Sequence, residues 1–169
     1  MAASEIQLPP ASYEIDQAAS TLRFATRAMF GLLPVRGSFT ISHGLITVAD
    51  PAEGSLVHVV VQTGSFESGN QQRDDHVRSA DYLDAARHPE IGFRSERLRS
   101  GADAALYGEL TVCGVTQPIA VALGTVVQEG KRLTASGTTT IDRYAFGITK
   151  AKGMTGRRLK IAVDIVAHR

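Results

Sequence analysis

The stretch Gln71–Ser95, QQRDDHVRSADYLDAARHPEIGFRS, separates two runs of short strand-like segments and decides how they are joined. It is the one part of the chain with convincing helical character. Asn70 is a favourable N-cap residue, and Asp74 and Arg78 have the i,i+4 spacing of an acid–base pair. Pro89 disfavours helix in the residue before it, so the chain resumes as the strand EIGF. The sequence therefore predicts one short polar helix inserted into a β-protein.

Residues on both sides of this stretch alternate with a period of two, which is typical of strands with one buried face. Leu22, Phe24 and Phe30 share a face near the N-terminus, and Ile161 and Val163 share one near the C-terminus. Short turns of the hairpin range join most of the strands. The pattern predicts about eight or nine strands.

Strands this numerous form either a sandwich or a closed barrel, and the pattern alone does not separate the two. Closure is favoured because pairing the last strand with the first would remove both sheet edges. An eight-stranded barrel either fills with side chains or holds one small ligand. Small residues at expected inward positions favour a cavity, namely Gly108, Gly124, Ala135, Ser136, Gly137 and Thr138 to Thr140.

Composition limits the range of functions. The 169 residues fit one domain, 13–169, preceded by a flexible tail, 1–12. The 18 Lys and Arg nearly balance the 17 Asp and Glu, so no global charge attracts nucleic acid. The single cysteine, Cys113, excludes an internal disulfide framework and a multi-cysteine metal site.

The chain also lacks targeting and membrane signals. No apolar run approaches the roughly 20 residues of a membrane helix, so we expect no stable membrane insertion. The N-terminus, MAASEIQLPPAS, has neither the basic region nor the apolar region of a secretory signal. These features predict a cytoplasmic protein.

Five segments carry a family resemblance, and they are ASTLRF (19–24), PVRGSF (34–39), RDDHVRSADYLDAARHPEIGFRS (73–95), YGELTVCGVTQPI (107–119) and IDRYAFGI (141–148). In this order and spacing, the chain resembles the YceI-like proteins, also called the polyisoprenoid-binding or lipid-binding YceI-like domain. Two positions depart from that family's pattern. Tyr13 stands where many members have tryptophan, and Ala28 stands where many have histidine.

The resemblance implies an all-β fold with one short helical insertion, namely a lipocalin-like eight-stranded antiparallel β-barrel enclosing an apolar cavity. It places the helical segment near one mouth and implies a homodimer. The implied ligand is an amphiphilic long-chain molecule of the polyisoprenoid, quinone or fatty-acid-like kind. No cofactor is expected.

On sequence alone, the large apolar residues fit an ordinary core, whereas the resemblance assigns them to a ligand tunnel. Arg73, His76 and Tyr82 of the helical stretch would then lie at its mouth. The candidate ligand-binding residues are Phe24, Phe30, Phe39, Val59, Arg73, His76, Tyr82, Phe93, Leu110, Ile119, Val121, Ile141 and Phe146.

The charged row from Arg73 to His76 allows three interpretations. It fits a solvated helix face, a motif that meets a ligand head group, or an acid–base cluster of Asp74, Asp75 and His76 acting on a bound isoprenoid-type lipid. No nucleophile, oxyanion donor or cofactor motif accompanies it, so we predict a binding protein and keep the enzyme as the alternative.

The histidines and one basic loop are two further candidate groups. The five histidines lack ligand spacing, which predicts no metal site. The basic loop of Lys150, Lys152, Arg157, Arg158 and Lys160 fits solvated surface or a contact with an anionic head such as a prenyl diphosphate.

Overall fold

A computed structural model describes residues 8–169. Strands dominate this part of the chain, with one α-helix and three short 3-10 helices. Within these residues, no helix is long and apolar enough to span a membrane. The elements in order are β1 (Ala11–Ile15), β2 (Thr21–Ala28), β3 (Leu33–Phe39), β4 (Ile41–Val48), η1 (Ala52–Gly54), β5 (Leu56–Gln62), η2 (Thr63–Ser65), α1 (Gln71–Arg78), β6 (Glu90–Arg99), β7 (Ala105–Val112), β8 (Val115–Glu129), β9 (Arg132–Asp142), η3 (Arg143–Phe146) and β10 (Arg158–His168).

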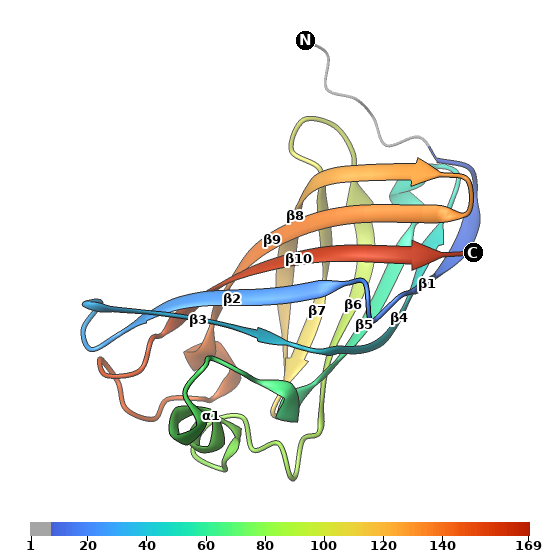
Figure 1. Ribbon diagram of the computed structural model, residues 1–169. Coiled ribbons are helices and arrows are strands. Elements are labelled where there is room, and N and C mark those ends of the chain that lie inside the picture. Colours follow the sequence, from blue (N-terminus) through green and yellow to red (C-terminus); the bar gives the residue numbers. More distant parts are fainter. Residues whose placement is uncertain (1–7) are drawn as a thin grey trace.

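The strands close into an antiparallel barrel (Figure 1). The last strand, β10, pairs with β1 near its end, where Ala167 opposes Ile15, and with β2 further back, where Ile161 opposes Phe24. β1 and β2 thus act as one interrupted barrel strand, and β3 and β4 act as another. The ten segments make eight barrel strands, and the predicted fold class is confirmed. Pairing of the first and last strands removes both edges of the ring.

The β2–β3 hairpin extends beyond the end of the barrel (Figure 1). β2 ends at Ala28, which opposes Leu33 of β3, and the chain turns through Met29 and Phe30. The period-two pattern suggested that Phe30 points into the barrel with Phe24. This is wrong, because the hairpin has left the barrel wall at that point and Phe30 is 77% exposed.

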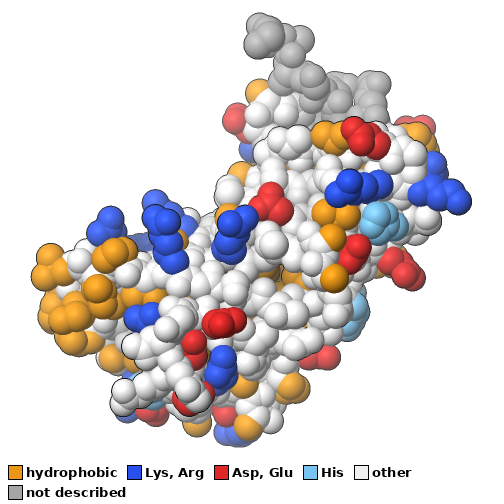
Figure 2. All heavy atoms as spheres, in the orientation of Figure 1, with side chains coloured by type: hydrophobic (Ala, Val, Ile, Leu, Met, Phe, Trp, Pro, Cys, Tyr) orange, Lys and Arg blue, Asp and Glu red, His pale blue; other side chains and the backbone are white. Residues whose placement is uncertain are grey.

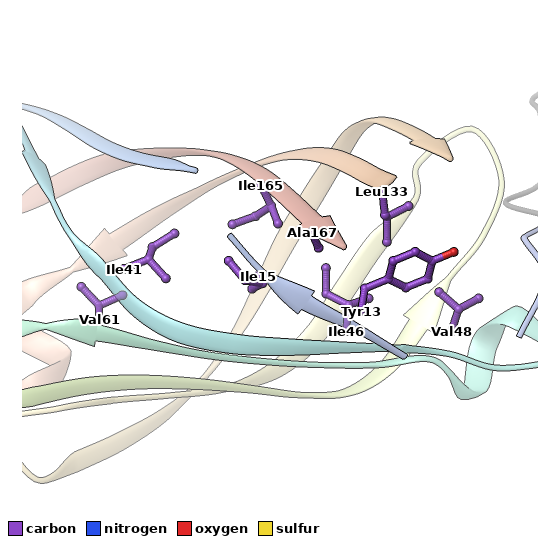
Figure 3. Close-up of a cluster of buried hydrophobic side chains, with 9 residues drawn as sticks. All are labelled: Tyr13, Ile15, Ile41, Ile46, Val48, Val61, Leu133, Ile165 and Ala167. Carbon is purple, nitrogen blue, oxygen red and sulfur yellow. The ribbon is translucent and has the colours of Figure 1, made fainter. Parts of the chain in front are cut away.

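One end of the barrel is filled by side chains (Figure 3). Tyr13, Ile41, Leu133, Ile165 and Ala167 belong to this cluster, which we call the Tyr13 cluster. Because fully buried side chains pack to near-crystalline density, the cluster closes the barrel at this end.

The N-terminal boundary differs from the predicted one. β1 begins at Ala11, and Leu8 packs against the Tyr13 cluster. The predicted tail of residues 1–12 therefore contributes its last two residues to the barrel. The part of that prediction that concerns residues 1–7 lies outside the described residues.

Residues 63–89 connect β5 to β6 and form a lid over the other end of the barrel (Figure 1). The lid contains α1, whose N-cap Asn70 accepts a 3.0 Å hydrogen bond from the Arg73 backbone N–H, as the sequence suggested. Val77 and Leu83 pack on two apolar clusters beneath the lid, one around Tyr82 and Phe146 and the other around Phe24. The helical insertion is thus an end cover for the barrel.

Candidate functional site

An interior cavity of about 230 Å³ lies between the Tyr13 cluster and the lid. Its wall draws on every barrel strand, with Leu83 of the lid at one end. Most of the apolar residues singled out in the sequence lie on this wall, namely Phe39, Val59, Phe93, Leu110, Ile119, Val121, Ile141 and Phe146. The wall also contains residues that sequence reasoning did not select, such as Leu22 and Leu106, because an alternating strand does not reveal which inward residues border empty space.

The cavity is long and slender. Leu159, Ile161, Val163 and Ile165 of β10 all line it, and at about 3.3 Å per residue they span roughly 20 Å. On neighbouring β9, the wall is formed by small residues, Ala135 and Gly137 among them. These small residues leave the space that larger side chains would fill.

Not all the predicted small residues border the cavity. Gly108 lies against the backbone of Arg94, and Gly124 lies against the Ser136 side chain where the β8–β9 register shifts. The small residues of β7 and β8 thus serve close approach between strands, whereas those of β9 serve the cavity.

Two polar residues of β9 on the wall use their hydroxyls in hydrogen bonds to the backbone of β8. The Ser136 Oγ accepts a 2.9 Å hydrogen bond from the Thr125 N–H, and the Thr139 Oγ1 donates to the Ala120 carbonyl at 2.8 Å. Polar groups that already form hydrogen bonds within the protein offer little hydrogen-bonding capacity to a ligand in the cavity. The cavity surface is therefore apolar.

Within the described part of the chain, Arg143 is the one charged residue that lines the cavity, and sequence reasoning missed it. Its side chain is buried, at 5% exposure. Nε donates to the Gly156 carbonyl at 2.8 Å, Nη1 to the Ile148 carbonyl at 2.8 Å and Nη2 to the Thr155 carbonyl at 3.1 Å. A guanidinium has five N–H donors, so these bonds leave donor capacity unused.

No carboxylate of the described residues lies within ion-pair distance of Arg143. Among the described residues, the positive charge at the lid end of the cavity therefore faces backbone carbonyls and two aromatic rings, with its Cζ 4.9 Å from the Tyr144 centroid and 5.8 Å from the Tyr82 centroid. The available signal in the sequence was weak, since Arg143 follows Asp142 directly in the segment IDRYAFGI (141–148) and resembles one half of a surface charge pair.

Tyr82 belongs to the lid and Phe24 to β2, and neither is among the cavity-lining residues. Tyr82 is buried, and its hydroxyl shares a 2.7 Å hydrogen bond with the Thr155 Oγ1. Phe24 stacks on Phe66 of the lid with ring centroids 4.8 Å apart. Both residues hold the lid to the barrel.

Cys113 adds another contact between barrel and lid. Its Sγ donates to the Leu83 carbonyl at 3.1 Å. Burial, followed by the nearby Asp84 carboxylate, raises the pKa of the Cys113 thiol. The raised pKa keeps the thiol protonated and able to donate.

The charged row of α1 divides between the lid interior and solvent. Asp74 is 4% exposed and accepts hydrogen bonds from the Ser68 N–H, at 3.0 Å from each carboxylate oxygen, and from the Ser68 Oγ. Arg73 also binds Ser68, through Nε at 2.8 Å from the Oγ. The predicted Asp74–Arg78 pair is wrong because Asp74 turns inward, and Arg78 pairs instead with Asp75 at 3.2 Å.

His76 lies on the outer side of the lid, where its Nε2 is 3.0 Å from the Asp81 Oδ2. The hydrogen bond from His76, and then the charge of Lys150, lower the pKa of Asp81. Neither Arg73 nor His76 is among the cavity-lining residues, and the same holds for Asp74 and Asp75. Among the described residues, no cluster of His, Cys, Asp or Glu is suited to hold a metal ion.

A closed antiparallel barrel with an apolar interior and a lid at one end defines a lipocalin-like barrel protein. The YceI-like domain matches residues 13–167, so the chain belongs to the YceI-like family.

The relatives in sequence are proteins named UPF0312. One from Pseudomonas savastanoi pv. phaseolicola is 33% identical over 139 residues, which cover 77% of this chain and 71% of the relative. One from Ectopseudomonas mendocina is 34% identical over 121 residues, which cover 67% of this chain and 63% of that relative. The match thus spans less than two thirds of the second protein.

Solved structures share the fold. Burkholderia cenocepacia BcnA is 24% identical with a TM-score of 0.80, covering 90% of this chain and 98% of BcnA. A polyisoprenoid binding domain from Saccharophagus degradans is 13% identical with a TM-score of 0.68, covering 92% of this chain and 97% of that domain. At these identities, the likeness shows the fold.

Proposed function

We propose that the chain binds one slender molecule with a long apolar tail inside the barrel and stores or carries it. The observation that carries the proposal is the apolar cavity, about 230 Å³ in volume and closed at one end by the Tyr13 cluster. The polyisoprenoid binding of the Saccharophagus degradans domain supports this ligand class. Polyisoprenoids, quinones with such tails and fatty-acid-like lipids all fit the description.

Apolar burial is sufficient to drive such binding. A tail with about ten buried carbons gains roughly 8 kcal/mol at about 0.8 kcal/mol per methylene, before the cost of association is subtracted. Each added methylene should improve the Kd about fourfold. The gain should stop when the tail reaches the Tyr13 cluster, so affinity should rise with tail length and then level off.

The head of the ligand would lie at the lid end, because the opposite end is closed. Arg143 offers unused donors there, and the loop 149–157 that it binds carries Lys150 and Lys152. An anionic head such as a diphosphate would therefore bind more tightly than a neutral alcohol with the same tail. Equal affinities of a prenyl alcohol and its diphosphate would remove this part of the proposal.

The test combines detection of a natural ligand with a variant that fills the cavity. Native mass spectrometry of gently purified protein should show a bound lipid, which extraction would then identify. Ala135→Leu inserts a larger side chain into the wall of the cavity and should weaken binding of long prenyl alcohols at least tenfold in a fluorescent-probe displacement assay.

Ala162→Leu is the matched control, because Ala162 is an exposed alanine on the neighbouring strand β10 and is not among the cavity-lining residues. It should bind like the wild type. A wild-type protein that is always empty and rejects added lipids would refute the proposal. Equal binding by the two variants would refute the assignment of the site to this cavity.

A further inference from the structure

The tip of the β2–β3 hairpin exposes a group of large apolar side chains, which we call the apolar tip, made of Met29, Phe30, Leu32, Leu33 and Met154. Phe30 is 77% exposed and Leu32 is 83% exposed. Figure 2 shows the hydrophobic side chains gathered over the end of this hairpin, at the left of the view. Contiguous apolar patches on a protein surface mark sites of interaction.

The apolar tip is held in place by backbone contacts. The Met29 N–H donates to the Met154 carbonyl at 2.8 Å, and the Phe30 N–H donates to the Gly153 carbonyl at 2.6 Å. Met29 and Phe30 have φ values of 50° and 57°, in the left-handed region that large side chains rarely adopt. A Cβ on Gly153 would come within 2.6 Å of the Phe30 ring, so only glycine leaves room for that ring.

The two segments that build the tip are strongly basic. Residues 21–39 contain three arginines and no acidic residue, and residues 143–163 contain six Lys or Arg and no acidic residue. The formal charge of the whole chain is only +1, because acidic residues elsewhere in the sequence balance these basic segments. Arg23 and Arg157 pair with carboxylates. The other exposed cations of these segments include Arg27 and Lys152, close to the tip residues in the chain, and Arg36 and Lys160, which lie further back opposite Ala25.

We propose that the apolar tip docks on the surface of a bilayer that contains anionic lipid. Phe30 and Leu32 would enter the interfacial region, and the surrounding cations would contact the lipid head groups. Apolar burial and attraction to anionic head groups act together in peripheral membrane binding, and each alone is weak.

The charges favour a bilayer over a second copy of the chain as the partner. A two-fold interface places the same patch of both subunits face to face. At this tip, such an interface would bring two clusters of cations together, since both segments lack acidic residues. An anionic lipid surface instead complements both the apolar tip and its basic surroundings.

Docking at this tip would bring the lid toward the bilayer. Met154 contacts the hairpin, and its neighbour Thr155 hydrogen-bonds Tyr82 of the lid. The tip and the lid therefore share one end of the barrel, opposite the Tyr13 cluster (Figure 1). If the proposed function holds, and this step rests on it, an apolar tail would pass between bilayer and cavity over a short distance.

The test is sedimentation with vesicles of phosphatidylcholine, with and without phosphatidylglycerol. The wild-type chain should bind the vesicles that contain phosphatidylglycerol, and added salt should weaken binding. Phe30→Ser combined with Leu32→Ser should lower the partition coefficient at least tenfold, and Lys152→Glu should lower it at least fivefold. The matched controls are Leu56→Ser, an exposed leucine on β5, and Lys131→Glu in the β8–β9 turn, and both should bind as the wild type does.

Several results would overturn the proposal. These are a wild-type chain that does not bind anionic vesicles, tip variants that bind as well as their controls, or binding that is indifferent to phosphatidylglycerol. Tip variants that change the mass measured by light scattering while vesicle binding persists would make the tip a self-association surface instead. Thermal melting checks that each variant is folded. Native mass spectrometry of the same samples reports bound ligand. A chain that docks on vesicles but never holds a ligand would refute the proposed function and leave the docking proposal standing.

Discussion

Asp74→Asn tests whether the charged row of α1 holds the lid in place. The carboxylate of Asp74 is buried and receives its hydrogen bonds from the Ser68 N–H and hydroxyl. Asparagine keeps one acceptor oxygen, but its side-chain NH2 is a donor and would face the Ser68 N–H and hydroxyl, which are donors as well. Losing charge-assisted hydrogen bonds and burying an unpaired donor should cost about 2–3 kcal/mol.

The loss should appear in thermal melting and in hydrogen exchange. At about 2–4 °C per kcal/mol for a chain of this size, the Tm should fall by roughly 4–12 °C if the lid unfolds with the barrel. If the lid opens by itself, the amides of Arg73 and Asp74, which donate to the side chain and the carbonyl of the N-cap Asn70, should exchange faster while those of the barrel keep their protection.

Asp75→Asn is the control on the same helix. Asp75 is 64% exposed and pairs with Arg78 at the surface, so its loss should change stability by less than about 0.5 kcal/mol. Asp74→Asn behaving like this control, in both melting and exchange, would refute the anchoring argument. An assay of lipid conversion in which Asp74→Asn abolishes turnover with lid protection unchanged would favour the enzyme alternative.

Three further predictions concern individual groups. The hydrogen bond from Arg157 lowers the pKa of Asp142 from its ordinary value of 3.8. The pair therefore stabilises the fold above pH 3.8, and this contribution is lost as pH falls through the lowered pKa. Arg157→Gln should raise the Asp142 pKa again in a carboxyl NMR titration, and an unchanged pKa would contradict the pairing. Burial raises the pKa of the Cys113 thiol above its ordinary value of 9.0, so alkylation by iodoacetamide should be slow at neutral pH and its rate should still be rising with pH at 9.0; rapid alkylation at neutral pH would contradict the burial. The Tyr13 hydroxyl is buried without a hydrogen-bond partner among residues 8–169, so Tyr13→Phe should leave the Tm unchanged or raise stability by up to about 1 kcal/mol, and a clear loss of stability would show that the hydroxyl has a partner.

The alternating strands predicted a β-protein without separating sandwich from barrel, the need to pair the last strand favoured closure, and the family resemblance implied the eight-stranded barrel. Ile161 and Val163 of β10 do face inward, and the β1–β10 pairing closes the ring. The alternation could not show where the barrel wall ends, which is why Phe30 was placed inside. How far a hairpin extends beyond the barrel depends on which strands it pairs with. The alternation of apolar residues in the sequence is the same inside and beyond the barrel wall.

The site was harder to predict because it depends on which polar groups meet in space. Asp74 reads as part of a solvated charge run, and only the position of Ser68 in the folded lid turns it inward. Arg143 is surrounded by carbonyls of a loop that begins after η3, and no spacing rule reports such contacts. The apolar wall was accessible to sequence reasoning, whereas the lid contacts were not.

The loop 149–157 joins three parts of the molecule through adjacent residues. Met154 accepts from the hairpin tip at Met29, the Thr155 hydroxyl bonds Tyr82 of the lid, and the Thr155 carbonyl accepts from Arg143 on the cavity wall. Displacing this loop would leave a buried guanidinium without the carbonyls that satisfy it, which is costly in a medium of low polarity. Small independent movements of tip or lid are therefore disfavoured, because each would remove a hydrogen-bond acceptor from Arg143.

An anionic head group arriving at Arg143 would supply replacement acceptors and lower that cost. Opening at the lid should accordingly be favoured when an anionic lipid is present.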